Sequence, residues 1–133
     1  MSDQLSFEAL ELAIASLEQG LREHEQYPQL TTVRDGVIQR FEVTLDLSRK
    51  MILRVLKDKY GLDDLAANNK TFIREAAKYE LIADAEAWMR YLESRNQTSH
   101  TYDAPIADRV FQSIPEFLPD ARYLLARLKN AIA

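Results

Sequence analysis

Residues 32–60 read TVRDGVIQRFEVTLDLSRKMILRVLKDKY, and this stretch decides the fold class. Its inward positions recur at alternating spacings of three and four residues, the period of one face of an α-helix. These positions are Ile38, Phe41, Leu45, Ser48, Ile52 and Val55. The pattern predicts a helix of about 28 residues, roughly 42 Å long. A capping box of Thr32 and Asp35 should begin it, and Gly61 should follow its end.

Similar patterns on both sides of this stretch predict further helices. Residues 6–26 carry an apolar stripe with the same alternating spacing, and Tyr27-Pro28 should end that helix because the residue before proline avoids the helical region. Residues 72–81 form a short helical pattern, which Asn69 or Thr71 could cap. No β-branched alternating run typical of strands is evident.

The C-terminal half continues in helical patterns. Trp88 should be in the core and Tyr91 at its rim, on a helix that Asp84 caps. Asp103 opens another helix, which Pro115 and Pro119 should interrupt or kink. The chain therefore predicts an all-α fold: an antiparallel four-helix up-and-down bundle with one or two extra short helices, in a single domain over residues 1–133.

Composition narrows the classes of function. The chain has 133 residues, 17 basic and 21 acidic side chains, and a net charge of −4. Proteins that depend on non-specific phosphate contacts are usually strongly basic, so a nucleic-acid role needs a local site. The absence of cysteine excludes disulfides and thiolate metal sites. No apolar run is long enough for a membrane span, and the N-terminus lacks the pattern of a signal peptide, which predicts a cytoplasmic protein.

Common catalytic motifs are missing. The sequence has no Gly-rich phosphate loop, no nucleophile elbow and no histidine spacing that suits a metal, so we expect neither a metal nor a cofactor. Of the two histidines, His24 has glutamates on both sides near the end of its helix, where a solvated side chain is the simplest interpretation. His100 lies in a different setting.

Residues 95–102, RNQTSHTY, are polar where a core helix should be apolar. Histidine can transfer protons near neutral pH, and arginine can bind phosphate through two N–H groups. Together they suit RNA cleavage without a metal: His100 would move the 2′-hydroxyl proton, and Arg95 would hold the charge on phosphorus. Asn96, Ser99 and Tyr102 add an amide, a hydroxyl and a phenol nearby.

Helical geometry separates these two groups. On a straight helix Arg95 and His100 would lie about 140° apart. Either the helix breaks before His100, or the two groups meet across an interface with a second copy of the chain. A purely structural role for both, at the end of a helix, is the simpler alternative.

The segment matches the Arg-x4-His-x-Tyr motif of HEPN domains (higher eukaryote and prokaryote nucleotide-binding). Longer strings resemble the bacterial family of nucleotidyltransferase substrate-binding proteins: RDGVIQRFE (34–42), LESRNQTSHTY (92–102), LSFEAL (5–10) and IREA (73–76). The similarity extends over nearly the whole chain in order.

This resemblance implies a helical homodimer that works beside a separately encoded minimal nucleotidyltransferase. Related pairs are toxin–antitoxin modules, in which the HEPN protein is a metal-independent ribonuclease and its partner silences it by attaching AMP groups to the motif tyrosine. Carried over, Arg95 and His100 would be catalytic, Asn96 and Ser99 would support them, and Tyr102 would be modified.

Other positions also follow from the resemblance. Arg40 and Glu42 could line the cleft opposite the motif. Asp46 is as well explained by an intrahelical pair with Lys50. Where the family usually has a tryptophan in the long helix, this chain has Ser48-Arg49, which would make a dimer or partner contact there more polar.

Three functions stay open. The first is a ribonuclease toxin restrained by its nucleotidyltransferase partner. The second is a non-catalytic subunit that presents RNA, a nucleotide or another substrate to that enzyme. The third is a helical dimer with a structural role.

Overall fold

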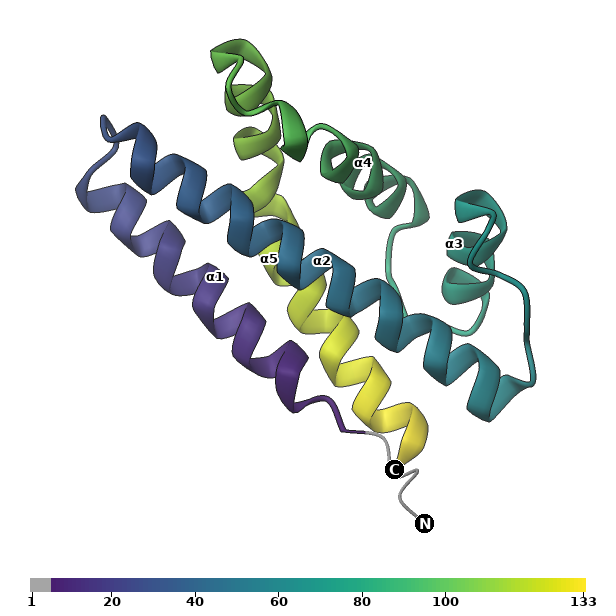
Figure 1. Ribbon diagram of the computed structural model, residues 1–133. Coiled ribbons are helices and arrows are strands. Elements are labelled where there is room, and N and C mark those ends of the chain that lie inside the picture. The colour runs from purple at the N-terminus through teal and green to yellow at the C-terminus, as the bar shows by residue number, and fades with distance from the viewer. Residues whose placement is uncertain (1–5) are drawn as a thin grey trace.

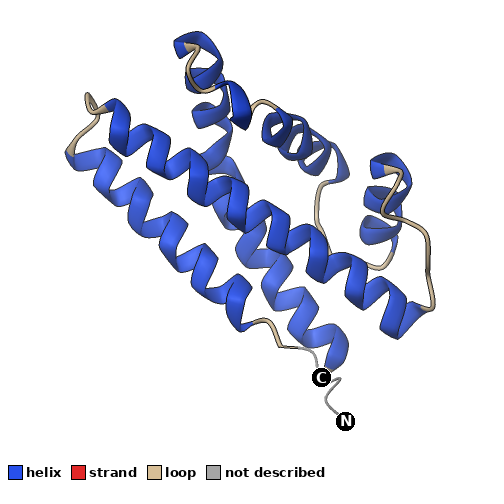
Figure 2. Cartoon of the chain, viewed as in Figure 1, coloured by secondary structure: helices blue, strands red, loops and turns tan. Residues whose placement is uncertain are grey.

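The computed structural model describes residues 6–133, and every regular element in this range is helical (Figure 1, Figure 2). Two long helices follow each other, α1 (Glu8–Gln26) and α2 (Thr31–Tyr60). The short helices α3 (Asn69–Lys78) and α4 (Ala85–Asn96) come next. A 3-10 turn (Thr98–His100) then leads into α5 (Ala104–Ile132). The expected all-α fold is confirmed, although Leu5 of the LSFEAL string lies outside the described residues.

The three long helices pack side by side, and the two short ones cover one side of them. Helices α1, α2 and α5 contact one another, while α3 and α4 pack on each other and on α2 (Figure 1). Helix α4 also contacts α5, which makes it the fourth member of the bundle. This arrangement brings α4 and the turn after it beside the middle of α2.

Four aromatic rings from three helices meet in the core of the bundle. They are Phe41, Trp88, Tyr91 and Phe117, all at most 1 % exposed. The Phe117 ring meets the other three edge to face, with centroids 5.1 to 5.6 Å apart. Edge-to-face pairs add stability beyond the area that they bury, so this cluster fixes α4 between α2 and α5.

Helix ends show where local signals were sufficient and where they were not. Asp84 caps α4 by accepting a hydrogen bond from the Ala87 N–H, and Gly61 follows α2 in the left-handed region, both as expected. The predicted capping box at Thr32 is wrong, because α2 begins one residue earlier and no side chain caps it. Helix α3 also begins earlier than predicted, after Asn68, whose Oδ1 accepts from the Thr71 N–H.

Helix α5 continues through both internal prolines, so the predicted interruption is wrong. Pro115 and Pro119 are four residues apart and both exposed, so they lie on the outer side of the helix. The carbonyl groups that they leave without an amide partner are therefore close to water. Burial of Ile114 and Phe117 on the inner side holds the helix together across this region.

Tyr91 is fully buried rather than at the rim of the core. Its hydroxyl donates a 2.5 Å hydrogen bond to Asp120 Oδ2, which satisfies the polar end of the ring. Burial, followed by this hydrogen bond, raises the pKa of Tyr91 well above the usual range for tyrosine, so the hydroxyl keeps its proton.

Tyr91→Phe should lower the free energy of unfolding by about 1–2 kcal/mol, because it removes a hydrogen bond to a charged group and leaves the ring in place. Urea denaturation of both proteins measures the difference. An unchanged midpoint would mean that the hydroxyl adds no net stability.

Candidate functional site

The chain leaves the path of helix α4 one residue after Arg95. Helix α4 ends at Asn96, and the 3-10 turn carries the backbone to His100. The Asp103 side chain then caps α5 by accepting from the Ile106 N–H. The helix therefore breaks before His100, which is one of the two arrangements that the spacing allowed. His100 and Tyr102 are both exposed as a result, and Tyr102 is 83 % exposed.

Arg95 lies against α2, where two carboxylates bind it. Its Nε and Nη2 atoms donate to the two oxygens of Asp46, at 2.9 and 3.1 Å. Its Nη1 atom lies 2.7 Å from Glu42 Oε2. Asp46 thus pairs across helices with Arg95, which is a different partner from the intrahelical Lys50 that the spacing suggested.

Thr98 completes this arrangement from the turn. The residue is buried, and its hydroxyl accepts a 3.2 Å hydrogen bond from Arg95 Nη1. The same oxygen lies 2.8 Å from the Arg95 carbonyl oxygen and 3.2 Å from Glu42 Oε2. Thr98 links the end of α4 to α2 and fixes the start of the turn that carries His100.

These contacts determine what Arg95 can offer to a ligand. Three of the five guanidinium N–H groups donate to Asp46 and Thr98. The hydrogen bond to Asp46 is the main cause that raises the pKa of Arg95, and the negative charges of Asp46 and Glu42 add to it. One guanidinium and two carboxylates leave the cluster with one net negative charge. A phosphate would have to use the remaining N–H groups or displace a carboxylate.

His100 and Tyr102 form a second pair on the solvent side of the turn. The His100 Nδ1 atom lies 3.2 Å from the Tyr102 hydroxyl, and the two rings meet edge to face at 5.8 Å. Within residues 6–133 the other ring nitrogen of His100, Nε2, has no hydrogen-bond partner. One nitrogen is therefore oriented by a phenol while the other can exchange a proton with a ligand.

The remaining residues singled out in the sequence lie around these two groups. Asn96 and Ser99 are exposed on either side of Thr98. Arg40 turns towards α1, where it donates to the Ser16 carbonyl at 3.0 Å, so it does not join Glu42 against Arg95. No hydrogen bond or ion pair joins Arg95 to His100 in the described part of the chain.

Two other features bear on partners and ligands. Arg49, at the position of the missing tryptophan, packs within the chain: it donates to the Ala66 carbonyl and lies 5.3 Å from the Phe72 ring centroid. In the range 6–133, no three histidine, aspartate or glutamate side chains gather as a metal site requires. Nor does any helix there have the length and apolar character for crossing a bilayer.

The sequence left Asp46 undecided between the cleft and an intrahelical pair with Lys50, and it missed Thr98. Asp46 follows Glu42 by four residues, so both carboxylates lie on one side of α2, and that spacing next to a polar motif was the available signal. Thr98 carries no comparable signal, because its contacts depend on how the helix ends.

Comparison with known proteins gives a consistent assignment. The family model described as nucleotidyltransferase substrate binding protein like matches residues 5–130. A Haemophilus influenzae protein named probable ribonuclease HepT is 37% identical over 140 residues, which cover 98% of this chain and 96% of that protein.

Solved structures support the same family assignment. One from Haemophilus influenzae, described as revealing the fold of a substrate-binding domain of a nucleotidyltransferase, matches with a TM-score of 0.84 and 35% identity over 93% of this chain and 99% of that one. A crystal structure from Thermus thermophilus matches with a TM-score of 0.75 and 30% identity over 90% of this chain and 98% of that one. The chain therefore belongs to the nucleotidyltransferase substrate-binding protein family.

Proposed function

We propose that this protein is a metal-independent endoribonuclease toxin of the HEPN type. In this proposal a separately encoded minimal nucleotidyltransferase silences it by adenylylation. The observation that carries the proposal is the exposed His100, which Tyr102 orients through one ring nitrogen and whose other ring nitrogen has no hydrogen-bond partner within residues 6–133. The relative named probable ribonuclease HepT supports the same activity.

The proposed reaction needs only groups of the protein and the RNA. His100 Nε2 removes the proton from a ribose 2′-hydroxyl, and the 2′-oxygen attacks the adjacent phosphorus. The bond from phosphorus to the 5′-oxygen of the next nucleotide breaks, that oxygen takes up a proton from water, and His100 returns the proton that it removed to the solvent. The products are a 2′,3′-cyclic phosphate and a 5′-hydroxyl. The N–H groups of Arg95 that do not donate to Asp46 or Thr98 would stabilise the negative charge that develops on the phosphate oxygens, with Glu42 displaced from Nη1.

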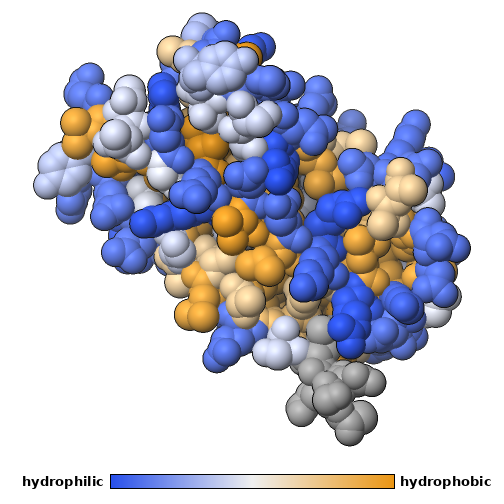
Figure 3. Space-filling view, viewed as in Figure 1, coloured by the Kyte–Doolittle hydropathy of each residue, from blue (hydrophilic) through white to orange (hydrophobic). Residues whose placement is uncertain are grey.

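A homodimer is part of this proposal, and an apolar face supports it. Leu12 of α1 and Val43 of α2 are 66% and 47% exposed, and the hydrogen bond from the Thr44 hydroxyl to the Ala13 carbonyl places them at the same level. Figure 3 shows apolar side chains over the middle of these helices. Since Val43 follows Glu42 directly, a second copy on this face would lie beside the Arg95 cluster and could bring further cations to it.

Adenylylation of Tyr102 would act directly on His100. The Tyr102 oxygen would attack the α-phosphorus of ATP and release pyrophosphate, leaving AMP on the atom that now contacts His100 Nδ1. Its bulk and negative charge would then occupy the path of the RNA. This reaction places the protein in the cytoplasm, where ATP and RNA are available.

Tyr102→Phe should make the toxin insensitive to its partner. The wild type, expressed alone, should stop growth, and co-expression with the nucleotidyltransferase should restore it. Tyr102→Phe should slow growth equally with and without the partner, since it lacks the oxygen that accepts AMP. This toxicity should be weaker than that of the wild type alone, because the variant also lacks the hydroxyl that orients His100. Growth curves, with intact-mass measurement of the purified proteins, test this directly. Tyr123→Phe, which alters another exposed tyrosine, is the matched control and should be silenced normally.

The alternative is a non-catalytic subunit that presents a nucleotide or another substrate to the nucleotidyltransferase. The net negative charge of the Arg95 cluster favours a subunit that does not cleave RNA, because such a site repels the phosphate group that would react. So does the description of the Haemophilus influenzae structure. This alternative predicts no growth arrest by the wild type in the same experiment.

A further inference from the structure

A cleft of about 400 Å³ opens between α4 and the first turns of α5. Ser94 and Gln97 line it on the α4 side, and Ile106 and Val110 line it on the α5 side. Its volume is within the range of pockets that bind small molecules. The 3-10 turn with His100 connects its two walls, so the cleft adjoins the segment that carries the proposed chemistry.

Two arginines line this α4–α5 cleft. Arg109 is exposed and makes no hydrogen bond or ion pair with any side chain in residues 6–133. Arg90 is held by Glu116 at 3.3 Å, and both members of that pair are more than half exposed. Exposed pairs contribute little net free energy, so a phosphate can replace Glu116 at small cost. Arg109 requires no such exchange.

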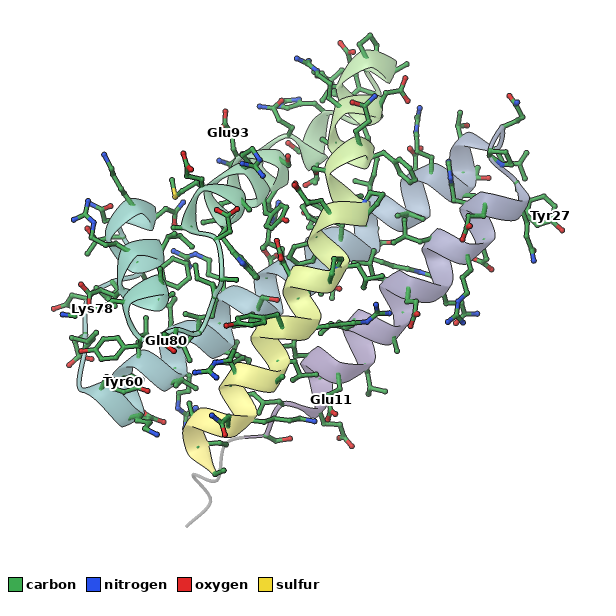
Figure 4. All side chains as sticks on the ribbon, turned by 180° about the vertical axis from the view of Figure 1, so that it is seen from behind. Glu11, Tyr27, Tyr60, Lys78, Glu80 and Glu93 are labelled. Atoms are coloured by element: carbon green, nitrogen blue, oxygen red, sulfur yellow. The ribbon has the colours of Figure 1, made fainter. Side chains whose placement is uncertain are left out.

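The other lining residues suit the rest of a nucleotide. Ile106 and Val110 present apolar surface, on which a base can lie. The Gln97 amide can donate and accept hydrogen bonds, as can the Ser94 hydroxyl. Glu93 lies on the α4 side of the cleft (Figure 4). Its carboxylate can accept a hydrogen bond from a ribose hydroxyl or a base amino group. Because its negative charge repels a phosphate, the phosphate would lie on the opposite side, near Arg109.

We propose that the α4–α5 cleft is a nucleotide-binding subsite, with Arg109 as its main phosphate ligand and Arg90 as the second. This inference deepens the proposed function and rests on it, since the nucleotide would be the neighbour of the one cleaved beside His100. The same chemistry fits a free mononucleotide, which the experiment separates from an RNA residue.

The experiment measures binding rather than cleavage, so we use His100→Ala as the background to keep the RNA intact. The probe is a fluorescein-labelled single-stranded RNA of about ten nucleotides, followed by anisotropy at several salt concentrations. AMP is added as a competitor in a second series. The variants are Arg109→Gln and Arg90→Gln. The control is Arg74→Gln, because Arg74 on α3 is also exposed and also has no partner within residues 6–133.

Arg109→Gln should weaken RNA binding about tenfold, as expected for loss of a charge-assisted contact. It should also lower the slope of log K against log salt by about 0.7, the value for one phosphate contact on a single strand. Arg90→Gln should have a smaller effect, and Arg74→Gln should stay within about twofold of the background.

The competitor distinguishes the two sources of the nucleotide. If AMP displaces RNA from the background protein but not from Arg109→Gln, the subsite binds free nucleotides as well as RNA. If AMP does not displace RNA, the subsite binds only nucleotides that are part of an RNA. Equal affinities of Arg109→Gln and Arg74→Gln would overturn the subsite, since only net charge would then matter. If the wild type cuts no RNA but RNA affinity still depends on Arg109, the subsite stands and the ribonuclease proposal fails. The failure of one proposal can therefore be told from the failure of the other.

Discussion

His100→Ala should lower the rate of RNA cleavage by about 100-fold or more, the usual contribution of a positioned general base or acid. The His100 side chain is exposed at the end of the turn, and its only hydrogen-bond contact within residues 6–133 is the one to Tyr102, which is also exposed. The substitution should therefore leave the fold intact. Initial rates on a labelled RNA, normalised to folded protein by circular dichroism, measure the loss.

His24→Ala is the matched control, since it removes the other histidine of the chain. The His24 ring lies 4.2 Å from the Phe111 ring, at the far end of α1 from the N-terminus. Its loss should change the rate less than about twofold. Equal losses in the two variants, or full activity of His100→Ala, would remove His100 from the reaction.

Arg95→Lys should lower kcat by about 100-fold and leave KM nearly unchanged. Lysine has the charge but a single nitrogen, so it cannot reach both oxygens of Asp46 and the Thr98 hydroxyl and still face a phosphate. Stability should change by less than about 1 kcal/mol, because the Asp46 side of the pair is 53% exposed. Single-turnover kinetics measure the loss in the rate of cleavage, and thermal melts measure the change in stability.

Arg122→Lys provides the comparison for this substitution. Arg122 binds Glu18 at 2.7 Å on the surface of the bundle, so it is also an arginine in an ion pair. It should keep the wild-type rate. Wild-type activity of Arg95→Lys would mean that charge alone matters, and the geometry of the Arg95 cluster would then have no catalytic role.

Most of the fold follows from patterns that depend on neighbours in the sequence. The three–four spacing in residues 32–60, the cap at Asp84 and the glycine at 61 each act within one or two helical turns, and all three appear as predicted. Pro115 and Pro119 do not interrupt α5, because burial of the opposite face of the helix outweighs the local preference for a break. Tyr91 was placed at the rim because its partner, Asp120, is 29 residues away.

In the candidate site, too, contacts between near neighbours in the sequence could be predicted and contacts between distant residues could not. His100 and Tyr102 are two residues apart, and the sequence alone suggested that they act together. The contact between Arg95 and Asp46 spans 49 residues and depends on how α4 packs against α2, which no local pattern specifies. His24 was expected to be solvated, yet it is half-buried against Phe111 because α5 crosses α1 at that point.

The most direct test of a metal-independent ribonuclease is cleavage of a small RNA panel by the purified wild type in EDTA, with chemical analysis of the new ends. We expect cleavage in the presence of the chelator, 2′,3′-cyclic phosphate and 5′-hydroxyl ends, and no products with His100→Ala. Folded wild-type protein that leaves every RNA intact, or that yields 3′-hydroxyl and 5′-phosphate ends, would contradict it.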